Sequence, residues 1–422
     1  MKPSMYNLIY ARNDCEKGYI AYNSFSGALA LMSEEEFHEY TDFSNGENGK
    51  LSNSLLEELK KGGFIVDDDT DEVMLVRHQA RRARYASDML GLTIAPTSDC
   101  NFRCAYCFEK GVLHNTVMSE ETQNALISFV ERQMPRISHL GISWYGGEPM
   151  MQMDIIERLS KRFMEMAEKH SVTYSAAIVT NGSLLTESNA KRLCECGVSV
   201  CQVTIDGGAD SHNRRRPFAN GAGTYEVITK NLSKAASILQ NIMVRVNLDK
   251  SNMNDFFEIK QFFNKNGLEN VRVYPAMVSS HNDCYDSKVC FDTEEFLALE
   301  YQIIRDAGTQ KSKIPVFRGN VCCADAVGGY VVDADGSLYK CWSDIGQKEL
   351  SFGNVLTGID RPMNEIIYLN EEIDARDECK QCKLLPVCLG GCPYRRRTGY
   401  GARCISSEDI LGKYLNDIAD AM

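Results

Sequence analysis

The distribution of cysteine is the feature that most constrains this chain. It has 17 cysteines in 422 residues, and most of them fall into two groups. Three form the sequence Cys100-x3-Cys104-x2-Cys107, and eight lie between residues 322 and 404. The odd count, and an N-terminus without an apolar signal segment, disfavour a disulfide framework. Clustered thiolates therefore indicate metal binding, and we expect a cytoplasmic protein.

Composition narrows the class of partner. Apolar residues make up 44% and charged residues 25%, as in ordinary globular proteins. The net charge of −12 disfavours general binding to nucleic acid or anionic membranes, and no stretch approaches the roughly 18 apolar residues of a membrane span. We expect neither nucleic acid nor membrane as a partner. The cysteines outside the two groups are expected to be small buried hydrophobes, namely Cys15, Cys194, Cys196, Cys201, Cys284 and Cys290.

The first cysteine group follows a strand-like run, 91–96, and a short loop. Three thiolates within eight residues can ligate three irons of a cubane cluster and leave the fourth iron open. A tetrahedral zinc site would require a fourth ligand, and no Cys or His follows Cys107 within six residues. The pattern favours an iron–sulfur cluster. A zinc knuckle or a loop of buried thiols is the alternative.

Several short motifs follow at the ends of predicted strands. They are Gly146-Gly147-Glu148-Pro149, Asn181-Gly182, Thr204-x-Asp206, and His212 with Arg216 four residues later. Each motif alone is weak. The whole series, with the three-cysteine spacing and Tyr106 before the last cysteine, resembles the radical SAM superfamily.

The resemblance implies S-adenosylmethionine (SAM) and a 4Fe–4S cluster held by Cys100, Cys104 and Cys107. In the family, the Gly-Gly-Glu segment holds the methionyl amino group. By position, Thr204 and Arg216 would contact the nucleoside and the carboxylate. The implied cofactor-binding residues are Tyr106, Gly146, Gly147, Glu148, Asn181, Thr204 and Arg216.

Strand-like and helical runs alternate from residue 91 to about 280, which predicts parallel strands with helices outside. Predicted strands are 91–96, 139–145, 174–180, 198–205, 243–249 and 270–275. Predicted helices are 119–134, 154–169, 187–196, 224–239 and 254–266. Motifs at the carboxyl ends of such strands are where an α/β barrel places its site. We expect an α/β fold in which residues 86–310 form the family's partial (β/α)6, TIM-like barrel.

The second cysteine group resembles the SPASM extension, expected over residues 311–422. Cys323 is followed by twelve residues and Gly336-x4-Cys341, then by Cys379-x2-Cys382-x5-Cys388-x3-Cys392 and by Cys404. The resemblance implies two auxiliary 4Fe–4S clusters, so three in all. One would use Cys341, Cys392 and one or both of Cys322 and Cys323. The other would use Cys379, Cys382, Cys388 and Cys404. Zinc ribbons are the alternative.

Residues 1–85 contain strand-like pieces followed by helical runs at 33–39 and 52–61. This small α+β pattern resembles the PqqD-like element of peptide maturases, which captures a leader peptide by adding it to a sheet edge. A docking domain without a ligand is the alternative. The basic run 77–84 predicts a linker helix.

The combined resemblance implies a radical SAM maturase of a ribosomally made peptide with a leader sequence. It would cleave SAM to a 5′-deoxyadenosyl radical, take hydrogen from the peptide and most often form a Cys-derived thioether. A flavodoxin- or ferredoxin-type donor would supply electrons. No catalytic side chain is assigned. An anaerobic sulfatase maturase is the alternative, although Trp342 stands after Cys341 where those enzymes carry Asp. A non-catalytic iron–sulfur carrier is a further alternative.

Overall fold

The computed structural model describes residues 1–13, 18–46, 50–111, 115–268, 270–280, 285–306, 314–316, 321–399 and 403–421. Cys15 and Cys284 lie outside these ranges. The chain forms two compact units. The sheet unit comprises Ala86–Phe291 and Cys323–Leu369, and the terminal unit comprises Met1–Tyr85, Asp292–Cys322 and Asn370–Met422.

The sheet unit is built on one ten-stranded sheet, ordered β11-β10-β9-β8-β7-β6-β12-β13-β14-β15. Six consecutive strands are parallel, and they agree with the six predicted strands within three residues at each end. They are β6 (Met89–Ile94), β7 (His139–Trp144), β8 (Thr173–Thr180), β9 (Val198–Thr204), β10 (Asn241–Leu248) and β11 (Arg272–Met277). The predicted α/β class is confirmed.

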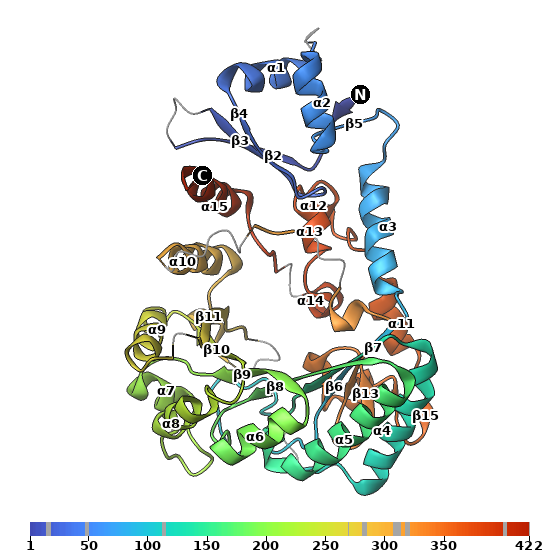
Figure 1. Cartoon of the computed structure of the whole chain (residues 1–422), viewed down its shortest axis with the longest axis vertical. Helices are drawn as coiled ribbons and strands as arrows, with labels where there is room; N and C mark the ends of the chain where they lie inside the picture. Colours follow the sequence, from blue (N-terminus) through green and yellow to red (C-terminus); the bar gives the residue numbers. More distant parts are fainter. Residues whose placement is uncertain are drawn as a thin grey trace. The chain divides into compact units, whose positions relative to one another are not determined.

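Helices connect these strands and cover the sheet's outer face (Figure 1). They are α4 (Glu120–Gln133), α5 (Met153–His170), α6 (Glu187–Glu195), α7 (Ala209–Arg215), α8 (Tyr225–Ala235) and α9 (Asp255–Lys265). Ser119 and Thr186 cap α4 and α6, because each side chain accepts an otherwise unpaired amide hydrogen of the first turn. Ile142, Ile178 and Val203 are buried beneath the helices, which leaves the opposite face for polar residues.

The sheet continues past β6 through β12 (Gly329–Val332), which runs parallel to it. Three antiparallel strands follow, β13 (Ser337–Tyr339), β14 (Gly353–Asn354) and β15 (Gly358–Ile359). The short helix α11 (Met363–Asn370) comes after them. The segment that contains Cys323 and Cys341 is thereby hydrogen-bonded to β6, the strand that precedes the first cysteine group.

The N-terminal part of the terminal unit has the predicted order of strands and helices. A three-stranded antiparallel sheet contains β2 (Asn7–Ala11), β3 (Tyr19–Asn23) and β4 (Leu29–Met32). Helices α1 (Glu34–Ser44) and α2 (Asn53–Lys61) follow, then β5 (Ile65–Val66), which pairs with β1 (Lys2–Pro3), and α3 (Glu72–Arg84). A capping box between Ser33 and Glu36 starts α1.

The C-terminal segments share cores with this N-terminal part. They contribute α10 (Thr293–Asp306), α12 (Asp377–Lys380), α13 (Leu385–Cys388), α14 (Pro393–Thr398) and α15 (Glu408–Asp420). One core combines Leu8 and Tyr22 with Leu411 and Leu415. Two ion pairs connect the basic helix α3 to the C-terminal segment of the same unit: Arg77 pairs with Asp374 at 2.6 Å, and Arg81 pairs with Glu372 at 2.5 Å.

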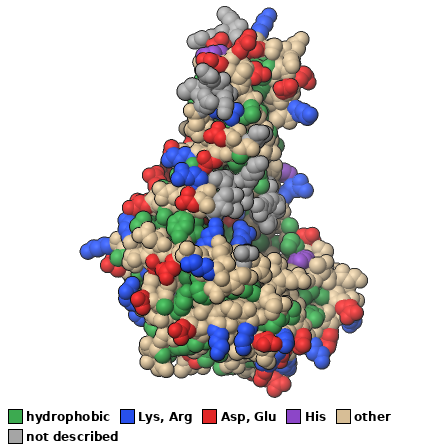
Figure 2. All heavy atoms as spheres, turned by 60° about the vertical axis from the view of Figure 1, so that its left-hand side comes forward, with side chains coloured by type: hydrophobic (Ala, Val, Ile, Leu, Met, Phe, Trp, Pro, Cys, Tyr) green, Lys and Arg blue, Asp and Glu red, His purple; other side chains and the backbone are tan. Residues whose placement is uncertain are grey.

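Two surface properties bear on partners. Figure 2 shows acidic and basic side chains interspersed over the face that it presents. In the described part of the chain, the helices are too short or too polar to span a bilayer.

Candidate active site

The three cysteines of the first group lie together in the loop after β6. The charge of Cys104 and that of Cys107 each act on Cys100, which places the three sulfurs near one another. Burial raises the pKa of Cys100 and of Cys107 to about 12, and neighbouring carboxylates and thiols add to the shift. Deprotonated sulfurs in such a site require a positive partner, which a metal cluster would supply.

The loop packs directly on the Gly-Gly pair that follows β7. Gly146 has φ of +87°, a left-handed conformation that favours glycine. A Cβ on Gly147 would lie 2.0 Å from the carbonyl oxygen of Asp99. The amide of Glu148 donates to that same oxygen at 2.8 Å. The glycines thus permit close approach of the cysteine loop itself.

Glu148 is fully buried, and its carboxylate joins the ends of β7 and β8. Oε1 accepts from the Thr180 hydroxyl at 2.7 Å and from the Met150 amide at 3.1 Å, and Oε2 accepts from the Asn181 amide at 2.7 Å. A carboxylate has about four acceptor positions, so about one remains for a ligand. The Asn181 side chain lies 4.0 Å from the Cys100 sulfur.

Tyr106 connects the cysteine loop to the ends of β9 and β10. Its hydroxyl donates to Oδ2 of Asp206 at 2.5 Å and accepts from Nη1 of Arg216 at 2.8 Å and from Nδ2 of Asn247 at 2.9 Å. Arg216 is buried, and its charge acts on Cys104. The hydroxyl of Tyr106 therefore positions the loop, and its ring contacts the Arg215 guanidinium and the Tyr285 ring.

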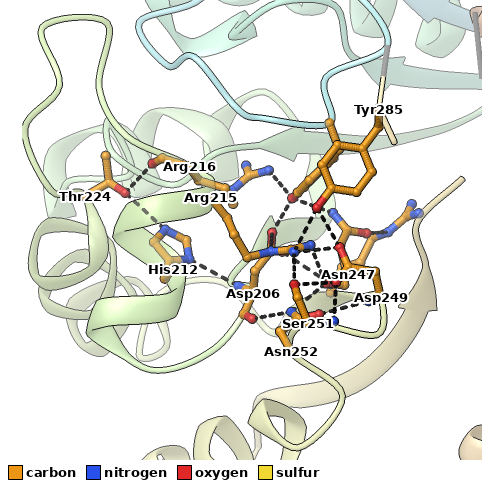
Figure 3. Close-up of polar contacts among 12 residues, drawn as sticks. Asp206, His212, Arg215, Arg216, Thr224, Asn247, Asp249, Ser251, Asn252 and Tyr285 are labelled. Carbon is orange, nitrogen blue, oxygen red and sulfur yellow. Dashed lines mark hydrogen bonds and ion pairs between the residues drawn. The ribbon is translucent and has the colours of Figure 1, made fainter. Parts of the chain in front are cut away.

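Sequence reasoning missed a buried ion-pair network beside this tyrosine, in which Arg215 lies among Asp249, Ser251 and Tyr285 (Figure 3). Arg215 donates to Asp249 at 2.6 Å and to Asp206 at 3.3 Å. Burial acts to raise the pKa of Asp249, but hydrogen bonds from Ser251 and Arg215 lower it overall. The position of Asp249 after β10 was the available signal.

His212 fixes the backbone of Arg216. Its Nδ1 accepts from the Asp206 amide at 3.1 Å, so Nε2 carries the proton and donates to the Thr224 hydroxyl at 3.1 Å. Thr224 then donates to the Arg216 carbonyl oxygen at 2.7 Å (Figure 3). Burial and the two arginines lower the pKa of His212 to about 3, so the ring is neutral. His212 and Arg216 are four residues apart, which is about one helical turn, and the Arg216 amide donates to the His212 carbonyl oxygen.

Cys341 and Trp342 lie beside the strand that leads to Gly146. The Trp342 ring stacks on Tyr145 with centroids 5.4 Å apart and is 48% exposed. The charges of Cys107 and Cys341 both act on the Tyr145 hydroxyl. Burial raises the pKa of Cys323, and the positive charge of Lys340 offsets part of that rise. The Lys340 ammonium also donates to the carbonyl oxygens of Ala326 and Gly329, which follow Cys323.

Thr204, the remaining predicted cofactor residue, is the last residue of β9 and lies in register with Arg245 on β10.

Cys379, Cys382, Cys388 and Cys404 form a second set within the terminal unit. Burial raises the pKa of Cys388 to about 11, and the charges of the other three act on it. Cys322 and Cys392 also belong to this unit, whereas Cys323 and Cys341 belong to the sheet unit. Among the remaining cysteines, Cys196 and Cys201 are buried as expected, Cys290 is half-buried and Cys194 is exposed.

Comparison with known proteins supports the resemblance that the motifs carry. A sequence model of the Radical SAM superfamily matches residues 94–263, the span that holds the cysteine loop and the motifs around it. Residues 94–263 therefore form a radical SAM domain. The match implies an enzyme that uses SAM and a 4Fe–4S cluster.

Two curated relatives extend the similarity. The radical SAM cyclopropyl synthase TigE of Paramaledivibacter caminithermalis is 25% identical over 84% of this chain and 79% of its own length. A cysteine-type anaerobic sulfatase-maturating enzyme of Clostridium perfringens is 26% identical over 72% of this chain and 88% of its own.

Two solved structures share the fold. Native anSMEcpe with bound AdoMet and the Kp18Cys peptide has a TM-score of 0.61 at 19% identity, covering 79% of this chain and all of that one. Streptococcus suis SuiB bound to its precursor peptide SuiA has a TM-score of 0.56 at 14% identity, covering 98% and 99%.

The residues present fit the family's cofactors. In the described ranges, no three Cys, His, Asp or Glu side chains are grouped as ligands of a single metal ion. A cubane takes each thiolate at a different iron, so its ligands lie further apart than those of one ion. The buried guanidinium of Arg216 near Cys104 complements the negative charge that three thiolates and a SAM carboxylate would bring.

Proposed function

We propose that this radical SAM enzyme is a peptide maturase that joins a cysteine sulfur to a carbon of another residue. The observation that carries the proposal is the pair of cysteine sets, one in the loop after β6 and one, Cys379 to Cys404, in the terminal unit. We assign Cys100, Cys104 and Cys107 to the SAM-binding cluster. The other cysteines between 322 and 404 would hold two auxiliary clusters, as the sequence resemblance implies.

When bound, the cluster and SAM supply a 5′-deoxyadenosyl radical. In the proposed reaction a carbon–sulfur bond forms while the peptide loses one hydrogen atom to that radical, one proton to solvent and one electron, which an auxiliary cluster would accept. Gly146, Gly147 and Glu148 would hold the methionyl amino group of SAM, and Thr204 and Arg216 would contact its nucleoside and its carboxylate. Tyr145 and Trp342 form an aromatic wall beside Cys341 that would help to exclude water.

A peptide substrate is supported by two relatives of the same fold, anSMEcpe and SuiB, whose structures contain bound peptides. The N-terminal sheet also offers a docking edge for a leader. In the described part of the chain, β4 pairs only with β3, and Leu31 on it is 45% exposed. We propose that a leader peptide adds there as a fourth strand, in the manner of PqqD-like elements.

Oxidation of a cysteine to formylglycine is the second candidate, because a sulfatase-maturating enzyme is among the relatives. Trp342 after Cys341 has no proton-accepting carboxylate, which favours the thioether.

Incubation of the reduced, anaerobically reconstituted protein with SAM and a short cysteine-containing peptide encoded beside its gene tests the proposal. We expect 5′-deoxyadenosine and a peptide that has lost two hydrogens and no longer reacts with iodoacetamide. A product in which oxygen replaces sulfur would establish the second candidate. An unchanged peptide would refute maturation.

A further inference from the structure

The sheet face opposite the helices carries an arginine on β10, the strand next to the end strand β11. Arg245 on β10 is in register with Thr204 on β9 and with Tyr274 on β11, so their side chains point to one face. On the same face, the Tyr274 hydroxyl donates to Oε1 of Gln202 at 2.6 Å. This face is opposite the one that the helices cover, and the carboxyl ends of its strands carry the cysteine loop.

Arg245 is half-buried, yet its guanidinium forms no ion pair within the described residues. Its Nε donates to Oδ1 of Asn247 at 2.8 Å, which leaves the two Nη groups. The buried Arg215 on the same side is compensated by two carboxylates. Leaving a partly desolvated cation without an anion is costly, so an unpaired arginine in a chain of net charge −12 requires an explanation.

The position of Arg245 relates it to the reaction site. Asn247 accepts from Arg245 and donates to the Tyr106 hydroxyl of the cysteine loop. The charge of Arg245 also acts on Tyr145, beside Gly146, and on Tyr274. Arg245 therefore lies on the sheet face that extends from Tyr145 after β7 to Tyr274 on β11, and a molecule that reacts above the cysteine loop would lie over this face.

We propose that Arg245 binds a carboxylate of the peptide substrate, an Asp or Glu side chain near the reacting residue. The planar guanidinium can form two parallel hydrogen bonds to one carboxylate. The polar side chains of Tyr274 and Gln202, on the same sheet face, would be neighbours of the bound carboxylate. This inference rests on the proposed function and adds a substrate class to it.

The methionyl group of SAM is the other source of a carboxylate. Arg216 already lies against the cysteine loop, directly on Tyr106 and near Cys104, whereas Arg245 reaches Tyr106 only through Asn247. The cation closer to the loop suits the cofactor, and the cation further along the sheet suits the substrate.

The test uses the reconstituted enzyme with SAM and two labelled synthetic peptides that differ only in Asp or Asn on both sides of a central cysteine. Fluorescence anisotropy gives their Kd values, and calorimetry gives the Kd for SAM. We expect the wild type to prefer the Asp peptide about 10- to 100-fold, the effect of one charged hydrogen-bonded contact. Arg245→Gln should abolish that preference, Arg245→Lys should keep part of it, and SAM binding should not change.

Arg272→Gln is the matched control, because Arg272 lies on the same sheet face but is exposed at the far end of β11. Equal wild-type affinities, no measurable binding of either peptide, or a preference that survives in Arg245→Gln would overturn the inference. A variant with weaker SAM binding and an intact peptide preference would assign the carboxylate to SAM. Failure of the proposed function is recognised separately, by the absence of any peptide mass change.

Discussion

A methyl group added at Gly147 should disable SAM cleavage while the fold survives. In Gly147→Ala, the new Cβ would lie 2.0 Å from the Asp99 carbonyl oxygen and 2.5 Å from its carbon. Relief to an ordinary contact of about 3.4 Å requires the cysteine loop to move by more than about 1 Å, because both atoms belong to the backbone. That movement also breaks the hydrogen bond from Glu148 to Asp99.

A displacement of this size in a reacting assembly costs about 100-fold in rate, and overpacking costs about 1–3 kcal/mol of stability. The assay is formation of 5′-deoxyadenosine by the reduced enzyme without peptide, with thermal unfolding in parallel. Gly91→Ala is the control, since a Cβ on this β6 glycine meets nothing within 4 Å. Wild-type cleavage by Gly147→Ala would refute the packing argument, as would equal losses in both variants.

Three further outcomes are expected. Alanine at Cys100, Cys104 or Cys107 should abolish SAM cleavage yet leave the auxiliary iron, as read from iron content and absorbance; normal turnover in any of them would contradict the ligand assignment. The wild type should bind about twelve irons, four for each of three cubanes, and a value near four would remove the auxiliary clusters. Since the pKa of His212 is lowered to about 3, its neutral form stabilises the fold fully above the unfolded pKa near 6.5, and stability falls by about 1.4 kcal/mol per pH unit below it. Denaturant unfolding of His212→Gln should show a shallower decline between pH 6.5 and 4 than the wild type, and parallel curves would be inconsistent with the buried neutral ring.

Much of the site followed from local patterns. The cysteine spacing and the motifs at strand ends predicted which segments meet, because parallel strands bring their carboxyl ends to one edge. The roles of individual side chains followed less well. The carboxylate of Glu148 is largely used by Thr180, Met150 and Asn181, and the hydroxyl of Tyr106 is used by Asp206, Arg216 and Asn247. Apart from the Met150 amide, those partners lie 32 to 141 residues away in the sequence, so no local spacing indicates them.

The sequence by itself determined the alternation of strands and helices, the candidate ligands and the family, since each depends on residues within a few positions of one another. Only the tertiary structure decided that segments from both ends of the chain share cores with the Cys379–Cys404 region. It also decided that, among the residues the structure describes, Arg215 has carboxylate partners and Arg245 has none. The physical reason is that burial and charge compensation depend on neighbours in space, which long-range packing supplies.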